Sequence, residues 1–311
     1  MKHIYMGVDV SKDYLDIYLE GHSHKITNTE TGISAFVNKH MRAEGYLIAL
    51  EPTGGYEREA LKVFGKKNFG IHMAHPNKVR HFSKSFGTKA KTDKLDAKLL
   101  CRYLEVNKLE PNYKKYSEVQ DNIFYLRRLS RSFEYNLHGA QCRIKQMPPA
   151  TRKHLEEQIA FYKKKIESIH QEIKEAVMSD KELKKKFEIM ITRKGVGDKT
   201  AIILLAEMPE IGSCNRREIA SLAGVAPITH SSGKSVGKSY IFGGRFGVRR
   251  ALYMSALVCA RHDLLLKKKY EKFISKGKPK KKALVALMRD ILTCLNSMLK
   301  EEKKFVLQKA A

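Results

Sequence analysis

The chain has 311 residues, of which 60 are lysine or arginine and 33 are aspartate or glutamate, so its formal net charge is +27. Apolar residues make up 42% of the sequence, which allows buried cores in two domains and excludes a disordered tail. The positive charge predicts a polyanionic partner; nucleic acid is the commonest one, and a membrane surface is the alternative.

Membrane insertion and secretion are both disfavoured by the sequence. No apolar run approaches the roughly 18 residues that a membrane-spanning helix needs, and the N-terminus resembles a strand rather than a signal peptide. The cysteines are far apart and form no CxxC pair: Cys101, Cys142, Cys214, Cys259 and Cys294. We therefore expect a cytoplasmic protein with reduced, buried thiols and no zinc site.

The first 110 residues alternate between short apolar segments and helical patterns. Strands are expected at 3–10, 14–19, 25–28, 46–51 and 71–74, and helices at 31–44, 57–67 and 76–86. This order is that of a ribonuclease-H-like (RNase-H-like) α/β fold, in which three antiparallel strands precede parallel strands joined by crossover helices.

Four acidic residues are placed where this fold would bring them together. Asp9 lies near the end of the first strand and Glu51 at the end of the fourth, which is expected to be its neighbour. Asp93 and Asp96 share one side of a helix that is expected to begin after the N-cap Thr92. Acids in a first helical turn usually do no more than complement the helix dipole, but four clustered carboxylates repel one another unless cations neutralise them. We therefore predict a site for two Mg²⁺ ions, roughly 3.5–4 Å apart, with Mn²⁺ as a substitute.

The middle of the chain predicts two long helices. One, over 119–145, has an apolar stripe of Ile123, Leu126, Leu129, Phe133 and Leu137. In the other, apolar residues follow a heptad rhythm from 155 to 173. A Pro-Pro turn at 148–149 separates them, which indicates an antiparallel hairpin that serves as a spacer or a dimer contact.

The last third of the chain has several glycine-rich or basic segments. Gly195 and Gly197 lie between two expected helices, either in a helix–hairpin–helix element that approaches phosphate or in an ordinary turn. A serine- and glycine-rich loop at 226–238 could cradle phosphate or present a nucleophilic serine, and no Ser-His-Asp spacing supports a triad. Helices are expected at 248–262 and 283–300. The residues expected to contact nucleic acid are Lys194, Gly195, Gly197, Lys199, Lys234, Lys238, Arg245, Arg249, Arg250, Lys280, Lys281 and Lys282.

Six motifs together resemble those of the insertion-sequence 110 family of DEDD recombinases and the similar Piv-type DNA invertases. They are VDVSK (8–12), EPTGGY (51–56), KTDKLDA (91–97), SGK (232–234), GGR (243–245) and RALYM (250–254), and they occur in the family's order. The resemblance implies a RuvC-like domain at 1–110, a coiled-coil linker at 111–188 and a mainly helical C-terminal transposase domain at 189–311.

The resemblance also assigns roles to individual residues. It implies that Asp9, Glu51, Asp93 and Asp96 are catalytic metal ligands and that Ser232 is the nucleophile. Ser231 stands where the family often has an acid.

The resemblance further implies partners. Transposon members act with a structured non-coding bridge RNA that pairs with donor and target DNA, and they assemble as a dimer of dimers. We therefore expect DNA, RNA and further copies of this chain as partners, in a prokaryotic cell and at the nucleoid.

We expect a Mg²⁺-dependent DNA transposase or site-specific recombinase in which Ser232 attacks phosphorus and Arg245 neutralises phosphate charge. Two alternatives stay open. One is a RuvC-like endonuclease or Holliday junction resolvase that uses water, and the other is an architectural nucleic-acid-binding protein.

Overall fold

The computed structural model describes residues 3–41, 45–53, 55–85, 93–113, 117–228, 231–232, 235–236 and 239–306. The chain divides into two compact units, Met1–Lys115 and Tyr116–Ala311, which are described separately below. None of the helices in the described residues is both long and apolar enough to cross a membrane.

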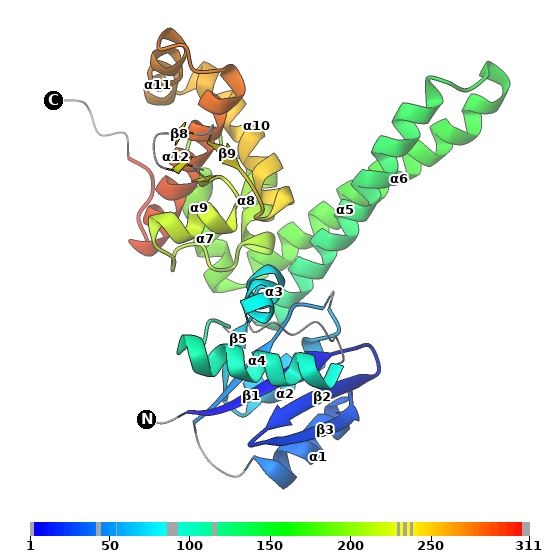
Figure 1. Cartoon of the computed structure of the whole chain (residues 1–311). Coiled ribbons are helices and arrows are strands. Elements are labelled where there is room, and N and C mark those ends of the chain that lie inside the picture. Colours follow the sequence, from blue (N-terminus) through cyan, green and yellow to red (C-terminus); the bar gives the residue numbers. More distant parts are fainter. Residues whose placement is uncertain are drawn as a thin grey trace. The chain divides into compact units, whose positions relative to one another are not determined.

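The N-terminal unit is built on a five-stranded mixed sheet with the order β3-β2-β1-β4-β5 (Figure 1). Its strands are β1 (Ile4–Val10), β2 (Tyr14–Leu19), β3 (His22–Thr27), β4 (Tyr46–Leu50) and β5 (Gly70–Met73). The β1–β2 and β2–β3 pairs are antiparallel, and the β1–β4 and β4–β5 pairs are parallel. The predicted strands and their directions are confirmed.

The third strand begins earlier than predicted, at His22 rather than Lys25. Leu19 pairs with His22, so only Glu20 and Gly21 connect the two strands. Both have positive φ angles, 47° and 88°, as tight two-residue hairpin turns require. Strand pairing therefore starts directly after the turn.

The helices described in this unit are α1 (Glu30–His40), α2 (Arg58–Lys66), α3 (Pro76–Ser85) and α4 (Asp93–Asn107). Thr29 caps α1 by accepting a hydrogen bond from the Gly32 amide. The helix ends at His40, earlier than the predicted residue 44, and the Met41 amide donates to the Val37 carbonyl at this end. The predicted N-cap of α4, Thr92, lies outside the described residues.

Two cores cover the two faces of the sheet. Met6 and Val8 of β1 pack with residues of α1 and α2 on one face. On the other face, Leu47 and Ala49 of β4 pack with Leu100 of α4. Figure 1 shows α4 lying across this second face.

The C-terminal unit is mainly helical. Its helices are α5 (Glu118–Ile144), α6 (Pro149–Ser179), α7 (Lys181–Ile191), α8 (Asp198–Glu207), α9 (Arg216–Leu222), α10 (Phe246–His262), α11 (Leu264–Ser275) and α12 (Lys280–Lys300). The predicted long helices, α5 and α6, pack against each other over much of their length (Figure 1). Pro149 is the first residue of α6, as the fixed φ angle of proline favours. The coiled-coil geometry of this pair stays a prediction, as does the three-domain division.

The predicted apolar stripe of α5 is wrong at Leu129, which is 49% exposed, whereas Arg127 and Ser130 are buried. Arg127 lies 2.7 Å from Glu134 and 3.1 Å from Glu207 of α8. The apolar pattern could not reveal this buried side of α5 because Arg127, at its centre, is charged. Burial of this charge is possible because two carboxylates pair with it.

One large core holds the C-terminal unit together, with contributions from α7, α8, α9, α10 and α12. Ile123 of α5 and Ile173 of α6 also belong to it, so one end of the helical pair is anchored in this core. The expectation that all five cysteines are buried is wrong, because Cys214 and Cys294 are only partly buried and Cys142 is exposed. Cys142 lies near the end of α5, beyond the part of the helix that the core covers.

Candidate active site

The two strand-end acids lie at the same edge of the sheet. Val8 of β1 is opposite Leu50 of β4, and Asp9 and Glu51 are the next residues along these parallel strands. Val8 and Leu50 both point into the core formed with α1 and α2. Because side chains alternate along a strand, Asp9 lies on the face that α4 covers, and the same alternation predicts this side for Glu51.

The helix with the other two acids lies directly on β1. A Cβ atom added to Gly7 would be 1.9 Å from the carbonyl oxygen of Ala97 and 2.5 Å from the amide nitrogen of Cys101. Only glycine therefore allows this approach of the two backbones. The Cys101 thiol also lies 3.4 Å from the carbonyl oxygen of Tyr5, to which it donates.

These contacts also give the direction of α4. Ala97 lies against Gly7 whereas Cys101 reaches back to Tyr5. The start of α4, with Asp96, is thus directed toward the end of β1 where Asp9 lies. Asp93 is the first residue of the helix, and its side chain is outside the described residues.

The structure adds an acid that the sequence analysis missed. Asp16 of β2 is directly opposite Asp9, and opposed residues of antiparallel strands have their side chains on the same face. Asp16 is only 6% exposed, and its carboxylate is 3.7 Å from the ammonium group of Lys25. Its position in an alternating strand was visible in the sequence, but only the strand register shows that it faces Asp9.

The donor set of this site is suited to a hard cation. Asp9, Glu51 and Asp96 carry carboxylate oxygens, which Mg²⁺ and Mn²⁺ prefer over nitrogen or sulfur, but these three side chains are not grouped closely enough in this structure to hold a metal ion. In the described part of the chain, no group of three or more His, Cys, Asp or Glu side chains is arranged to hold a metal ion. The predicted tetrad includes Asp93, whose side chain lies outside this part.

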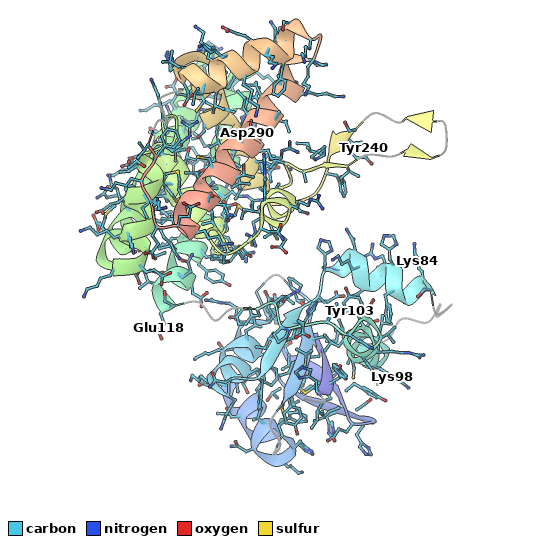
Figure 2. All side chains as sticks on the ribbon, turned by 90° about the vertical axis from the view of Figure 1, so that its left-hand side faces the viewer. Lys84, Lys98, Tyr103, Glu118, Tyr240 and Asp290 are labelled. Carbon is cyan, nitrogen blue, oxygen red and sulfur yellow. The ribbon has the colours of Figure 1, made fainter. Side chains whose placement is uncertain are left out.

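The predicted serine nucleophile is in the C-terminal unit, on a β-hairpin arm rather than a loop. We define this arm as residues 227–241, which contain β6 (Pro227–Ile228), β7 (Ser231–Ser232), β8 (Ser235–Val236) and β9 (Tyr240–Ile241). β6 pairs with β9 and β7 pairs with β8, with Ser232 opposite Ser235. Figure 2 shows Tyr240 where the arm leaves the helices and the β7–β8 pair at its far end. Lys234 and Lys238 lie outside the described residues.

The predicted phosphate contacts around the Gly-Val-Gly segment divide into two kinds. Gly195 has a φ angle of 83°, and a Cβ atom there would lie 2.3 Å from the Cys259 sulfur, so packing alone explains this glycine. Gly197 precedes α8 as its N-cap, and a Cβ atom there would meet nothing within 4 Å. Packing therefore does not explain Gly197, and a phosphate contact at the start of α8 stays a prediction. Lys194 and Lys199 are exposed on either side.

The predicted arginine contacts already have partners within the unit. Arg245 makes two hydrogen bonds of 2.6 Å to the Glu210 carboxylate. Arg250 lies 3.2 Å from Glu134, and Arg249 donates to the carbonyl of Gly243. These bonds hold the first turn of α10 in place. By contrast, Lys280, Lys281 and Lys282 are exposed at the start of α12.

Two family models match this chain. One, a DEDD model of IS110 elements that is described as "Transposase", matches residues 6–146, which include the four acids. The other, described as "Transposase IS116/IS110/IS902 family", matches residues 188–271, which include the arm.

Individual relatives agree with these matches. The chain is 26% identical to the pilin gene-inverting proteins of Moraxella bovis and Moraxella lacunata, over 98% of this chain and 98% of each relative. It is 33% identical over 115 residues to the insertion element IS110 uncharacterized 43.6 kDa protein of Streptomyces coelicolor. That match covers 36% of this chain and 28% of the relative.

Proposed function

The chain belongs to the IS110 family of transposases, and on this premise we propose that it is a metal-dependent DNA recombinase with a serine nucleophile. Its full-length relatives are named as proteins that invert a pilin gene, so either inversion or transposition of a DNA segment would be the outcome. The chain has 60 basic and 33 acidic residues, and this positive net charge supports a partner with many phosphates.

The observation that best supports this proposal is that the ends of β1 and β4, with Asp9 and Glu51, and the start of α4 lie toward one edge of the sheet. The strand order β3-β2-β1-β4-β5, with its antiparallel and parallel halves, also supports an RNase-H-like, RuvC-like domain. In such a domain, Asp9, Glu51, Asp93 and Asp96 would hold two Mg²⁺ ions, which when bound would polarise the scissile phosphate.

Ser232 would carry out the covalent step. Its Oγ atom forms a bond to phosphorus while the bond from phosphorus to the 3′ oxygen of the DNA breaks, and that oxygen takes up a proton. The hydroxyl proton of Ser232 passes to a carboxylate of the acidic site. The hairpin arm must therefore meet an acidic site, either in its own chain or in another copy.

Two further elements of the proposal concern binding. We propose that the chain acts with a structured RNA that pairs with donor and target DNA, and that it assembles as a dimer or a dimer of dimers, as its resemblance to transposon members of the family implies. A phosphate contact by Arg245 would require this arginine to exchange Glu210 for the phosphate, because both 2.6 Å hydrogen bonds are directed at that carboxylate.

The covalent adduct provides the test. Labelled DNA that carries the recombination site of the host element is incubated with protein and Mg²⁺, then separated on a denaturing gel. We expect an adduct with the wild type and with the matched controls Ser231→Ala and Ser235→Ala, but none with Ser232→Ala. Cleaved DNA without adduct in any variant would instead indicate a water-using nuclease, and an adduct that persists in Ser232→Ala would refute the assignment.

The acids are tested in the same assay. Asp9→Asn, Glu51→Gln, Asp93→Asn and Asp96→Asn should each abolish cleavage and leave DNA binding nearly unchanged, because each removes one ligand charge and also relieves repulsion. A mixture of Ser232→Ala and Asp93→Asn proteins should regain some activity if the site is shared between copies. Normal recombination by Asp96→Asn would contradict the four-carboxylate site.

A further inference from the structure

The base of the hairpin arm borders a cavity that the proposed reaction does not use. Its volume is about 790 Å³, within the usual range for small-molecule sites, and β6, β9, α10 and α12 all contribute to its lining. Val225 and Val285 are among the apolar residues that line it, and two aromatic residues, Tyr240 and Tyr253, also line it. Figure 2 shows Tyr240 at this base, beside the helices.

The lining also contains four basic residues, of which Lys278 precedes α12. Lys281, Lys282 and Arg289 of α12 line the cavity, and the described residues around it include no carboxylate. Lys281 and Lys282 are in the first turn of α12, where no acidic residue offsets the positive end of the helix dipole. Two ammonium groups at this end of a helix both favour an anion beside them.

Tyrosine rings and apolar side chains beside several cations match the chemistry of a nucleotide. The flat base stacks on aromatic rings, and the phosphates pair with lysine and arginine. A base within a duplex cannot enter such a cavity, because its partner and its stacked neighbours hold it in place. An unpaired base can.

We propose that this cavity binds one unpaired nucleotide of the DNA strand on which the arm acts. The base lies against Tyr240 and Tyr253, and the flanking phosphates contact Lys281, Lys282 and Arg289. This proposal rests on the proposed function, because β9 at the cavity and β7 with Ser232 are parts of the same arm. Binding an unpaired nucleotide here would keep a strand open near the attacked phosphate, as strand exchange requires.

The test measures binding without cleavage. Three fluorescein-labelled DNA duplexes of one sequence are compared by fluorescence anisotropy at one salt concentration with EDTA present. One is fully paired, one has a single unpaired thymine, and one has an abasic residue in place of that thymine. We expect the unpaired thymine to bind about ten-fold tighter than the other two, because stacking of one base accounts for the difference.

Matched variants connect this preference to the cavity. Tyr240→Ala should remove the preference for the unpaired thymine and leave the affinity for the paired duplex unchanged. Tyr240→Phe should keep the preference, because the ring remains. The control is Phe242→Ala. Phe242 is an aromatic residue two positions after Tyr240; it is 69% exposed and does not line the cavity. Lys281→Gln combined with Arg289→Gln should weaken binding of the unpaired thymine more than binding of the abasic probe.

Several results would overturn the proposal. They are equal affinity for the three duplexes, a preference that survives Tyr240→Ala, and tighter binding of an RNA probe with the same unpaired base. The Ser232 adduct is a separate measurement. An adduct without the preference refutes this inference alone, and the preference without an adduct refutes the serine mechanism alone.

Discussion

Gly7→Ala tests whether the contact between α4 and β1 sets the geometry of the acidic site. The new Cβ atom would start 1.9 Å from the Ala97 carbonyl oxygen, whereas ordinary van der Waals contact begins at 3.4 Å. The helix must therefore move by about 1.5 Å, or the strand must bend. The two nearest atoms, the Ala97 carbonyl oxygen and the Cys101 amide nitrogen, belong to the helix backbone, so no side-chain rotation relieves the clash.

The magnitude follows from two effects. Overpacking of a core costs about 1–3 kcal/mol of unfolding free energy. Asp96 directly precedes Ala97, and metal–oxygen distances tolerate a change of only about 0.2 Å. A displacement beyond 1 Å costs on the order of 100-fold in rate. We therefore expect a modest loss of stability together with loss of cleavage and of Mn²⁺ binding.

The assays are urea denaturation, calorimetric titration with Mn²⁺, and the gel described above, each with the full chain. The control is Gly139→Ala in α5, where an added Cβ atom meets nothing within 4 Å. This change should stabilise the helix by about 0.5–1 kcal/mol. Wild-type stability and Mn²⁺ affinity in Gly7→Ala would refute the reasoning, because α4 would then not depend on its close approach to β1.

Three further predictions concern stability, thiol reactivity and affinity. Glu207→Ala should lower the unfolding free energy by about 1–3 kcal/mol, measured in urea, because it removes one of the two carboxylates bonded to the buried Arg127 and leaves Glu134 in place; an unchanged unfolding free energy would contradict this. Iodoacetamide at pH 8 should modify the exposed Cys142 before the buried Cys101, whose pKa burial raises to about 11; mass spectrometry reports the order, and equal rates would show that the N-terminal core opens readily. Changing the lysines at 280–282 to glutamine should weaken binding to any duplex and reduce the slope of log affinity against log salt by roughly 2–3; loss at one target sequence alone would mean that they read bases.

The sequence alone determined the strands, their directions and the position of the acids at the strand ends. Apolar alternation and helical periodicity involve only residues that are close in the chain, so they can be read from the sequence. The predicted bounds of β2 agree with the observed ones, and those of β4 differ by one residue. The acids Asp9 and Glu51 could be placed near each other because parallel strands that are neighbours end at the same edge of a sheet.

Only the tertiary structure decided which groups meet across the fold. The register between β1 and β2 brings Asp16 opposite Asp9, and the absence of a Cβ atom at Gly7 lets α4 approach β1. Arg127 is buried because two carboxylates reach it, one of them from another helix. Contacts of this kind join residues that are far apart in the chain, and local periodicity carries no information about such partners.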